Sequence, residues 1–355
     1  WNEYTWRGDQ APGTPFATGL QASDMDFSDL RRSKFVLQIG KNLVENKMPE
    51  SHWLNEVMER GGKVACITPD YSAPSAKSDY WIGTRPGLGD LALLLGVARI
   101  IIDNKWFDQQ FVERFTDLPL ERLRPQDVVA SYQLKDLRDG PSYKIQGLTD
   151  EQRSRIGDFC MWDAEHKRVV PVSRDEVGDR LAFTPALDGE FTVKTVGGAD
   201  VAVMPIFEMY RRHLKDYDAK TAGEISGADP AMIERLAKDL ATIKPAAIHF
   251  GEGVNHYFHA TLHNRAWFLL AALTGNVGTN GAGVMAWAGN YKGAMFQGAP
   301  WAGPGVAVFK DEDPFAPLLD EKATPTKEQL SHSALGEEPS YWAHGEKILR
   351  VRTPE

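Results

Sequence analysis

Short apolar runs alternate with amphipathic stretches in the first third of this chain. Phe35–Ile39 and residues 64–67 are short, mainly apolar stretches of strand length. The stretch between them has helical spacing from Ser51 to about Arg60, with Ser51 as the expected N-cap and Gly61-Gly62 as its end. Strands that alternate with helices predict a parallel, doubly wound sheet.

The same order of elements returns later in the chain. Residues 91–102 form a strongly apolar helical stretch, with Asp90 as the expected cap. Asp229-Pro230 is a helix start with proline at the first helical position. The apolar run Ala246–Phe250 follows, and then a helical stretch over residues 260–274. We therefore predict an α/β fold with two doubly wound, Rossmann-like units.

The chain divides into three parts on this pattern. Residues 1–222 hold an ordered N-terminal loop, the first α/β domain and a surface elaboration with a small β-hairpin at 191–204, around Gly197-Gly198. Residues 223–288 form the second α/β unit. Residues 289–355 are rich in Gly, Pro and Trp with little periodicity, so we expect an irregular tail packed on the rest of a larger subunit. The start at Trp1 also suggests an internal piece of a longer protein.

Composition and charge narrow the class of protein. A net charge of −9 argues against a general binder of nucleic acid or anionic membranes. We expect no direct membrane span, because no run of about 18 apolar residues exists. The two cysteines, Cys66 and Cys160, are far apart in sequence and form no C-x-x-C pair, so the chain encodes no zinc knuckle or iron–sulfur set of its own.

Candidate ligand groups follow the predicted strands, where open α/β sheets bind their ligands. Gly40 and the amides before the helix at Ser51 suit a phosphate. Asp70 follows the next strand, and its carboxylate can accept from a ribose hydroxyl or a guanine N–H. The alternative is that Asp70 only caps a turn after Pro69. Neither glycine loop has the G-x-G-x-x-G spacing of ordinary dinucleotide dehydrogenases.

Three histidines, His256, His259 and His263, form an H-x2-H-x3-H pattern. The spacing allows His259 and His263 to share one helix face as metal ligands. No nearby Cys, Asp or Glu completes such a set, since Glu252 would have to fold back. His256 lies in the loop and can point at a ligand, although it can equally be satisfied by a backbone carbonyl.

Several longer motifs resemble one family. The segments GEGVNHYFH, LTGNVGTNGAG, IGKNLVENKMPESHW, ITPDY and RPGLGD together resemble the molybdopterin oxidoreductases of the dimethyl-sulfoxide-reductase family. The segments WNEYTWRGDQAPGTPFATG, WAGNYKGAMFQG and EEPSYWAHGEK are similar to the branch that holds nitrate, perchlorate and selenate reductases and nitrite oxidoreductase, and most of all to its nitrite-oxidising members.

The resemblance implies roles for particular residues. Asp9 matches the aspartate that ligates molybdenum in this branch. His256, with the adjacent Asn255, matches the catalytic position beside the metal. The cofactor implied is molybdenum bis(molybdopterin guanine dinucleotide). The residues that match the segments holding its two guanosine-pyrophosphate arms are Gly40, Lys41, Asn42, Pro69, Asp70, Gly87, Asp90, Gly251, Glu252 and Gly253.

The implied activity is oxygen-atom transfer that oxidises nitrite to nitrate. Electrons would leave through a [4Fe–4S] cluster held outside this chain and an iron–sulfur β subunit, and a haem γ subunit is a further candidate partner. Reduction of nitrate, chlorate, perchlorate or selenate is the rival within the same branch. A non-catalytic nucleotide-binding or scaffolding fragment is the rival from another class. The resemblance favours the periplasmic side of a membrane and leaves the cytoplasmic side open.

Overall fold

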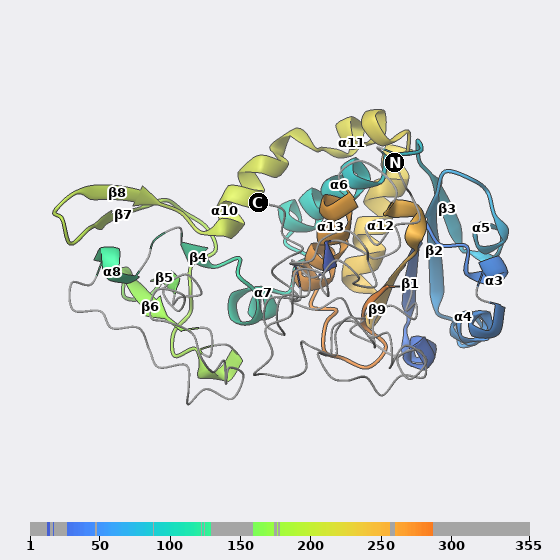
Figure 1. Ribbon diagram of the computed structural model, residues 1–355, viewed down its shortest axis with the longest axis horizontal. Coiled ribbons are helices and arrows are strands. Elements are labelled where there is room, and N and C mark those ends of the chain that lie inside the picture. The colour runs from blue at the N-terminus through green and yellow to red at the C-terminus, as the bar shows by residue number, and fades with distance from the viewer. Residues whose placement is uncertain are drawn as a thin grey trace, which may run out of the picture.

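A parallel β-sheet lies at the centre of the described chain (Figure 1). The structure is a computed structural model that describes residues 13–14, 17, 27–46, 48–87, 89–121, 123, 125–128, 159–173, 176, 178–255 and 260–286. Within these residues the sheet has five strands, all parallel, in the spatial order β10 (Gly283–Ala286), β9 (Ala246–Phe250), β1 (Phe35–Ile39), β2 (Lys63–Thr68) and β3 (Tyr80–Gly83).

The central strand β1 is buried along its whole length, as its largely apolar sequence predicts, and this burial includes the polar Gln38. It pairs with β2 on one side, from Phe35 opposite Lys63, and with β9 on the other, from Phe35 opposite Ala246. The two strand-and-helix segments expected to form separate units therefore contribute strands to one sheet. The α/β class and the parallel sheet agree with the sequence-based prediction.

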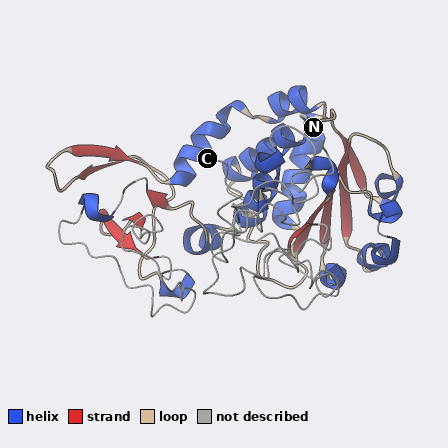
Figure 2. Ribbon diagram, in the orientation of Figure 1, coloured by secondary structure: helices blue, strands red, loops and turns tan. Residues whose placement is uncertain are grey.

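Helices cover both faces of the sheet (Figures 1 and 2). The helices on one face are α6 (Gly89–Asp103), α11 (Ala219–Ser226), α12 (Pro230–Thr242) and α13 (Ala260–Leu273). The elements on the other face are η1 (Phe27–Arg32), α3 (Leu43–Asn46), η2 (Met48–Glu50), α4 (Ser51–Glu59) and α5 (Ala73–Lys77). The result is a three-layer, doubly wound arrangement.

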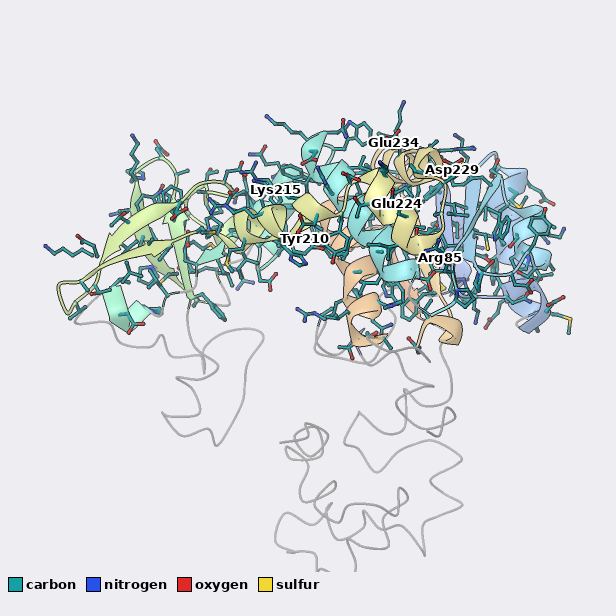
Figure 3. The ribbon with its side chains drawn as sticks, turned by 90° about the horizontal axis from the view of Figure 1, so that it is seen from above. Arg85, Tyr210, Lys215, Glu224, Asp229 and Glu234 are labelled. Carbon is teal, nitrogen blue, oxygen red and sulfur yellow. The ribbon has the colours of Figure 1, made fainter. Side chains whose placement is uncertain are left out.

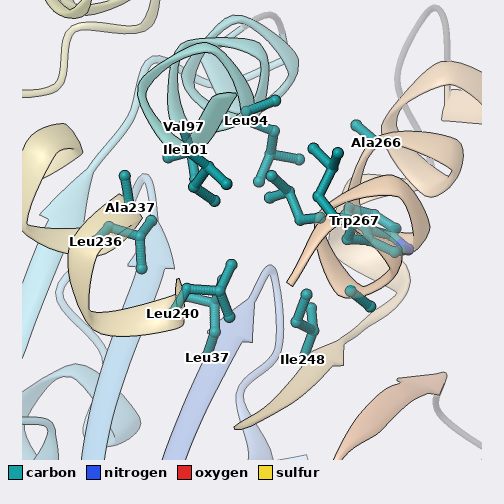
Figure 4. Close-up of a cluster of buried hydrophobic side chains, with 14 of the residues drawn as sticks. Leu37, Leu94, Val97, Ile101, Leu236, Ala237, Leu240, Ile248, Ala266 and Trp267 are labelled. Atoms are coloured by element: carbon teal, nitrogen blue, oxygen red, sulfur yellow. The ribbon is translucent and has the colours of Figure 1, made fainter. Parts of the chain in front are cut away.

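Alternation along the strands supplies a core on each face. Leu37 and Ile248 pack with Leu240 of α12 and Trp267 of α13 (Figure 4). Residues one position earlier on the strands, Val36 and Ala247, point to the opposite face and pack beneath η1 and α4. Full burial of one such large side chain stabilises the fold by roughly 1.5–3 kcal/mol.

A second lobe projects from the α/β body (Figure 1). Its antiparallel sheet consists of β4 (Leu120–Glu121), β5 (Phe159–Asp163) and β6 (Arg168–Val172), and its hairpin of β7 (Phe191–Lys194) and β8 (Asp200–Val203). The hairpin lies where the sequence predicts it. Trp162 stacks on Phe191 with ring centroids 4.2 Å apart, which joins the two sheets.

Short helices lie within this lobe or between it and the body. They are α7 (Gln109–Phe115), α8 (Pro125–Val128), η4 (Gly178–Arg180), α10 (Ile206–His213) and η5 (Leu214–Asp216). In the described part of the chain no helix is both long and apolar enough to cross a membrane. η6 (Glu252–Val254) belongs to the loop after β9.

Two expected helix caps differ in the structure, and the reason is local. Glu50 occupies the N-cap position of α4, because Ser51 already lies in the helix and donates its hydroxyl to the Met48 carbonyl instead. Asp90 lies in the first turn of α6, which begins at Gly89. The predicted start at Asp229 is confirmed, since its carboxylate accepts from the Ala231 amide at 2.9 Å. The predicted tail, residues 289–355, lies outside the described residues.

Candidate functional site

The carboxyl ends of the parallel strands gather most of the predicted ligand residues at one edge of the sheet. Residues 40–42 follow β1, residues 69–70 follow β2, residues 84–87 and 89–90 follow β3, and residues 251–255 follow β9. Because all of these strands run in the same direction, the four loops emerge at the same edge. We call this edge the carboxyl-edge site.

The two glycine loops of the carboxyl-edge site pack directly against each other. A Cβ atom added at Gly251 would lie 2.5 Å from the Gly40 carbonyl oxygen, and one added at Gly253 would lie 2.9 Å from it. Gly40 has a φ of 54°, in the left-handed region, and its neighbour across the gap is Val254. Glycine is therefore required at these positions for the loops of β1 and β9 to meet.

The side chains of Lys41 and Asn42, in the loop after β1, lie in different environments. Lys41 is 6% exposed, and its aliphatic stem lies against Gly251. Asn42 donates from its side-chain nitrogen to the Glu45 carboxylate. Its buried Oδ1 atom accepts no hydrogen bond from the residues that the structure describes. The loop thus keeps one acceptor available at the site.

Asn255 links the β9 loop to helix α13. Its Oδ1 atom accepts a 2.9 Å hydrogen bond from Nδ2 of Asn264, and Oδ1 of Asn264 accepts one of 2.8 Å from the amide of Gly13. Both hydrogen bonds are buried. The Nδ2 atom of Asn255 has no partner within the described chain, so it is a second unfilled polar group at the site.

Pro69 and Asp70 are exposed at the end of β2. The Asp70 carbonyl, rather than its carboxylate, closes the turn, because it accepts from the Thr68 hydroxyl at 2.5 Å and the Ser72 amide at 3.0 Å. No described residue donates a hydrogen bond to the Asp70 carboxylate. The buried hydroxyl of Ser72 likewise lacks a partner in the described chain.

The loop after β3 is held to helix α11. Arg85 and Glu224 are labelled in Figure 3. The Arg85 guanidinium donates to the Glu224 carbonyl at 2.6 Å, and the Arg85 amide donates to the Ser226 carbonyl at 2.7 Å. Gly87, with a φ of 89°, makes the turn. Asp90 is buried, and it accepts from the Thr84 hydroxyl at 3.0 Å. Burial raises the pKa of Asp90 to about 6, and the Thr84 hydrogen bond opposes that rise.

Some predicted residues cannot be placed. Asp9, His256 and His259 lie outside the described residues, and only the main chain of Glu252 is described. His263 is buried in α13. In the portion of the chain that the structure describes, no group of three or more His, Cys, Asp or Glu is arranged to hold a metal.

The structure adds three residues that the sequence did not single out. Asn264, Ser72 and Gly13 each contribute a contact or an open polar atom beside a predicted loop. Asn264 could have been recognised as a polar residue on the otherwise apolar helix that follows the β9 loop. Ser72 and Gly13 offered no such signal, because their roles depend on partners distant in sequence.

Buried polar atoms that lack a protein partner indicate whether the carboxyl-edge site fits a nucleotide-bearing cofactor. Three buried polar atoms from separate loops remain without protein partners in the described chain: Asn42 Oδ1, Ser72 Oγ and Asn255 Nδ2. Buried polar groups in native proteins are nearly always satisfied. One donor, one acceptor and one hydroxyl at a ligand-binding edge suit a polar ligand with its own donors and acceptors.

Comparisons with known proteins point to one family. The family model "Molybdopterin oxidoreductase" matches residues 4–346. The perchlorate reductase subunit alpha of Dechloromonas aromatica (strain RCB) is 31% identical over 308 residues, which cover 83% of this chain and 33% of that protein. The respiratory nitrate reductase subunit alpha of Haloferax mediterranei is 29% identical over 301 residues, which cover 83% of this chain and 30% of that protein.

Among solved structures, acetylene hydratase from Pelobacter acetylenicus aligns with a TM-score of 0.47 and 20% identity, over 78% of this chain and 25% of that one. The chain spans about a third of the length of the two curated relatives named above.

Proposed function

The chain belongs to the molybdopterin oxidoreductase family, and we propose that it is the cofactor-binding portion of a catalytic subunit that transfers oxygen atoms to or from an oxyanion. Similarity to the alpha subunits of a perchlorate reductase and a nitrate reductase supports an oxyanion substrate. Family membership implies a molybdenum–pterin cofactor. Its guanine dinucleotide form, with two pterins, is part of the proposal.

The carboxyl-edge site is where this chain would hold that cofactor. The proposed binding residues are Gly40, Lys41, Asn42, Pro69, Asp70, Gly87, Asp90, Gly251, Glu252 and Gly253. The open atoms of Asn42 and Ser72 support this assignment, because a guanosine arm offers donors and acceptors to pair with them. When bound, the cofactor supplies the two-electron chemistry, and the protein supplies position and electrostatic field.

One observation supports the proposed catalytic groups. Gly13 is joined through Asn264 to Asn255 by two hydrogen bonds. Asp9 precedes Gly13 by four residues, so covalent geometry keeps it within about 14 Å of that anchor. His256 directly follows Asn255. The motif resemblance assigns Asp9 as the molybdenum ligand and His256, with Asn255, as catalytic groups beside the metal, and the link from Gly13 to Asn255 supports that assignment.

These residues would act on the oxyanion in simple ways. His256 would donate a hydrogen bond to an oxyanion oxygen, which orients the substrate and stabilises developing negative charge. The Asn255 amide nitrogen, open on the loop, would offer a second donor. In the oxidising direction the net reaction converts nitrite and one water into nitrate, two protons and two electrons.

Two directions of reaction remain candidates for the same site. The motif likeness favours nitrite oxidation. The names of the relatives support reduction of nitrate or perchlorate at least as well. In either direction the electrons would pass through a [4Fe–4S] cluster outside this chain to an iron–sulfur partner subunit, with a haem subunit as a further candidate.

The test is metal and nucleotide analysis of the purified protein, followed by assays in both directions. Molybdenum together with guanine nucleotide supports the proposal, whereas the absence of both favours a non-catalytic scaffold. Nitrate formation from nitrite with an artificial electron acceptor, compared with nitrate or perchlorate consumption with a reduced dye, decides the direction. Asp9→Asn should alter the molybdenum EPR or X-ray absorption signature, and Asp26→Asn should not. An unchanged metal spectrum in Asp9→Asn contradicts the ligand assignment.

A further inference from the structure

A pair of fully buried polar side chains lies beneath the carboxyl-edge site. Gln38 of β1 and His249 of β9 stand opposite each other in the strand register, and each is 0% exposed. Two residues earlier on the same strands, Val36 and Ala247 belong to the apolar core beneath η1 and α4. Because side chains alternate along a strand, Gln38 and His249 point toward this same layer. A polar pair therefore interrupts an otherwise apolar face.

The polar atoms of this pair have no protein partners in the described chain. These atoms are both side-chain atoms of Gln38, Oε1 and Nε2, and both ring nitrogens of His249. Burial, together with the nearby positive charge of Lys41, lowers the pKa of His249 to about 3, so the imidazole is neutral at ordinary pH. A neutral imidazole has one donor and one acceptor, and a glutamine amide has both kinds as well. Leaving all of them unpaired would be strongly unfavourable.

The surroundings of the pair indicate what kind of ligand it takes. The rings of Phe27 and His249 make a T-shaped contact, with centroids 5.0 Å apart and nearly perpendicular planes. Across the sheet the same row continues with Met285 on one side and Cys66 on the other. The groups around the pair are thus an aromatic ring and two sulfur-bearing side chains. Such surroundings suit a small neutral ligand that can donate and accept at once.

We propose that Gln38 and His249 form a buried water site, in which one or two ordered water molecules bridge β1 to β9. A bridging water would accept from the Gln38 amide or from the protonated ring nitrogen. It would donate to the Gln38 carbonyl oxygen or to the other ring nitrogen. Buried waters typically make about three hydrogen bonds to groups that otherwise lack partners. The bridge would lie two residues before Gly40 and Gly251, where it ties together the strands that carry both glycine loops.

The site can be tested with substitutions that conserve volume. Gln38→Met and His249→Leu each remove one side of the water site and leave the other side unpaired, whereas packing alone changes little in such exchanges. We expect each single variant of the purified protein to lower the midpoint of thermal unfolding by about 2–8 °C. The double variant should lose less than the sum of the two. Cys66→Val, on the next strand of the same face, is the control and should change the midpoint less than either.

A rise in the unfolding temperature of the single variants would contradict the water site. If the pair is dry, each single substitution removes an unsatisfied polar group and raises the unfolding temperature, which overturns the proposal. A crystal structure supplies an independent test that needs no variant. Ordered water within about 3.2 Å of a His249 ring nitrogen supports the site, and its absence, with the two side chains well ordered, contradicts it.

Discussion

Asn264 donates a 2.9 Å hydrogen bond to Asn255, and both side chains are buried. Asn264 also accepts from the Gly13 amide, so one helix residue joins the N-terminal segment to the β9 loop. We predict that Asn264→Leu leaves both partners unpaired and lowers the free energy of unfolding by about 1–3 kcal/mol. Chemical denaturation measures this loss. Asn104→Leu, at an exposed position after α6, is the control, and an equal loss there would contradict the linking role.

The close approach of the two glycine loops gives a second prediction. In Gly251→Ala the new methyl group meets the Gly40 carbonyl and the Lys41 stem, so the loops must separate. We expect a loss of about 1–3 kcal/mol in stability, typical of overpacking, and a lower cofactor content. Gly197→Ala is the matched control, because its Cβ atom would have only the Thr195 hydroxyl at 4.0 Å as a neighbour. Equal stability in the two variants would refute the contact.

A substitution of Asp70 is expected to weaken cofactor binding without changing the stability of the fold. Its carboxylate is exposed and receives no hydrogen bond from the described chain, so Asp70→Ala should leave the unfolding temperature unchanged. If it pairs with a guanine edge, loss of the charged acceptor weakens cofactor binding by about 1.5–3 kcal/mol. Guanine and molybdenum content of the purified variant measure the effect. Asp117→Ala, an exposed aspartate in the loop before β4, should keep both contents, and full content in Asp70→Ala would remove the residue from the site.

The buried carboxyl of Glu121 is expected to make the stability of the fold depend on pH, independently of the carboxyl-edge site. It is 4% exposed, and neither carboxylate oxygen has a partner in the described chain. Burial raises the pKa of Glu121 from 4.5 to about 7. The folded state therefore holds the proton more tightly than the unfolded state. The contribution of the protonated Glu121 to the free energy of unfolding is fully present below pH 4.5 and is lost as the pH rises through about 7.

The Glu121→Gln variant should remove that dependence. Its unfolding temperature should fall less than that of the parent protein between pH 4.5 and 8, so the variant becomes the relatively more stable form near neutral pH. Thermal unfolding over this pH range is the measurement. Glu234→Gln, at an exposed position on α12, is the control. Parallel pH curves for parent and Glu121→Gln would show that the carboxyl is not the cause.

Local sequence predicted the elements of the α/β body well, because each carries its own signal. The apolar runs of β1 and β9 fall at the predicted residues. The helix start at Asp229 is encoded by a cap and a proline. Ser51 was misjudged as a cap because its hydroxyl finds a carbonyl in the preceding turn. A competing local hydrogen bond of this kind leaves no mark in the pattern.

The assembly of the elements was harder to predict from sequence. Periodicity shows that β1 and β9 are strands, but it does not show that residues more than two hundred positions apart pair in one sheet. The antiparallel β5 and β6 were missed because the apolar parts of Phe159–Asp163 and Arg168–Val172 are short and lie within a charged tract. The grouping of the predicted loops at one edge followed from the parallel direction of the strands. The Asn264 link required the fold itself.

The strand order also constrains how the chain can reach its folded state. β1 is the middle strand, yet its neighbour β9 is made some two hundred residues later. During synthesis, the β9-facing edge of β1 therefore remains unpaired until the ribosome has delivered residues 246–250. Pairings so distant in sequence slow folding, and an exposed apolar strand edge invites association with other chains. The topology thus makes the β9-facing edge of β1 the place where association with another chain is most to be expected before β9 is in position.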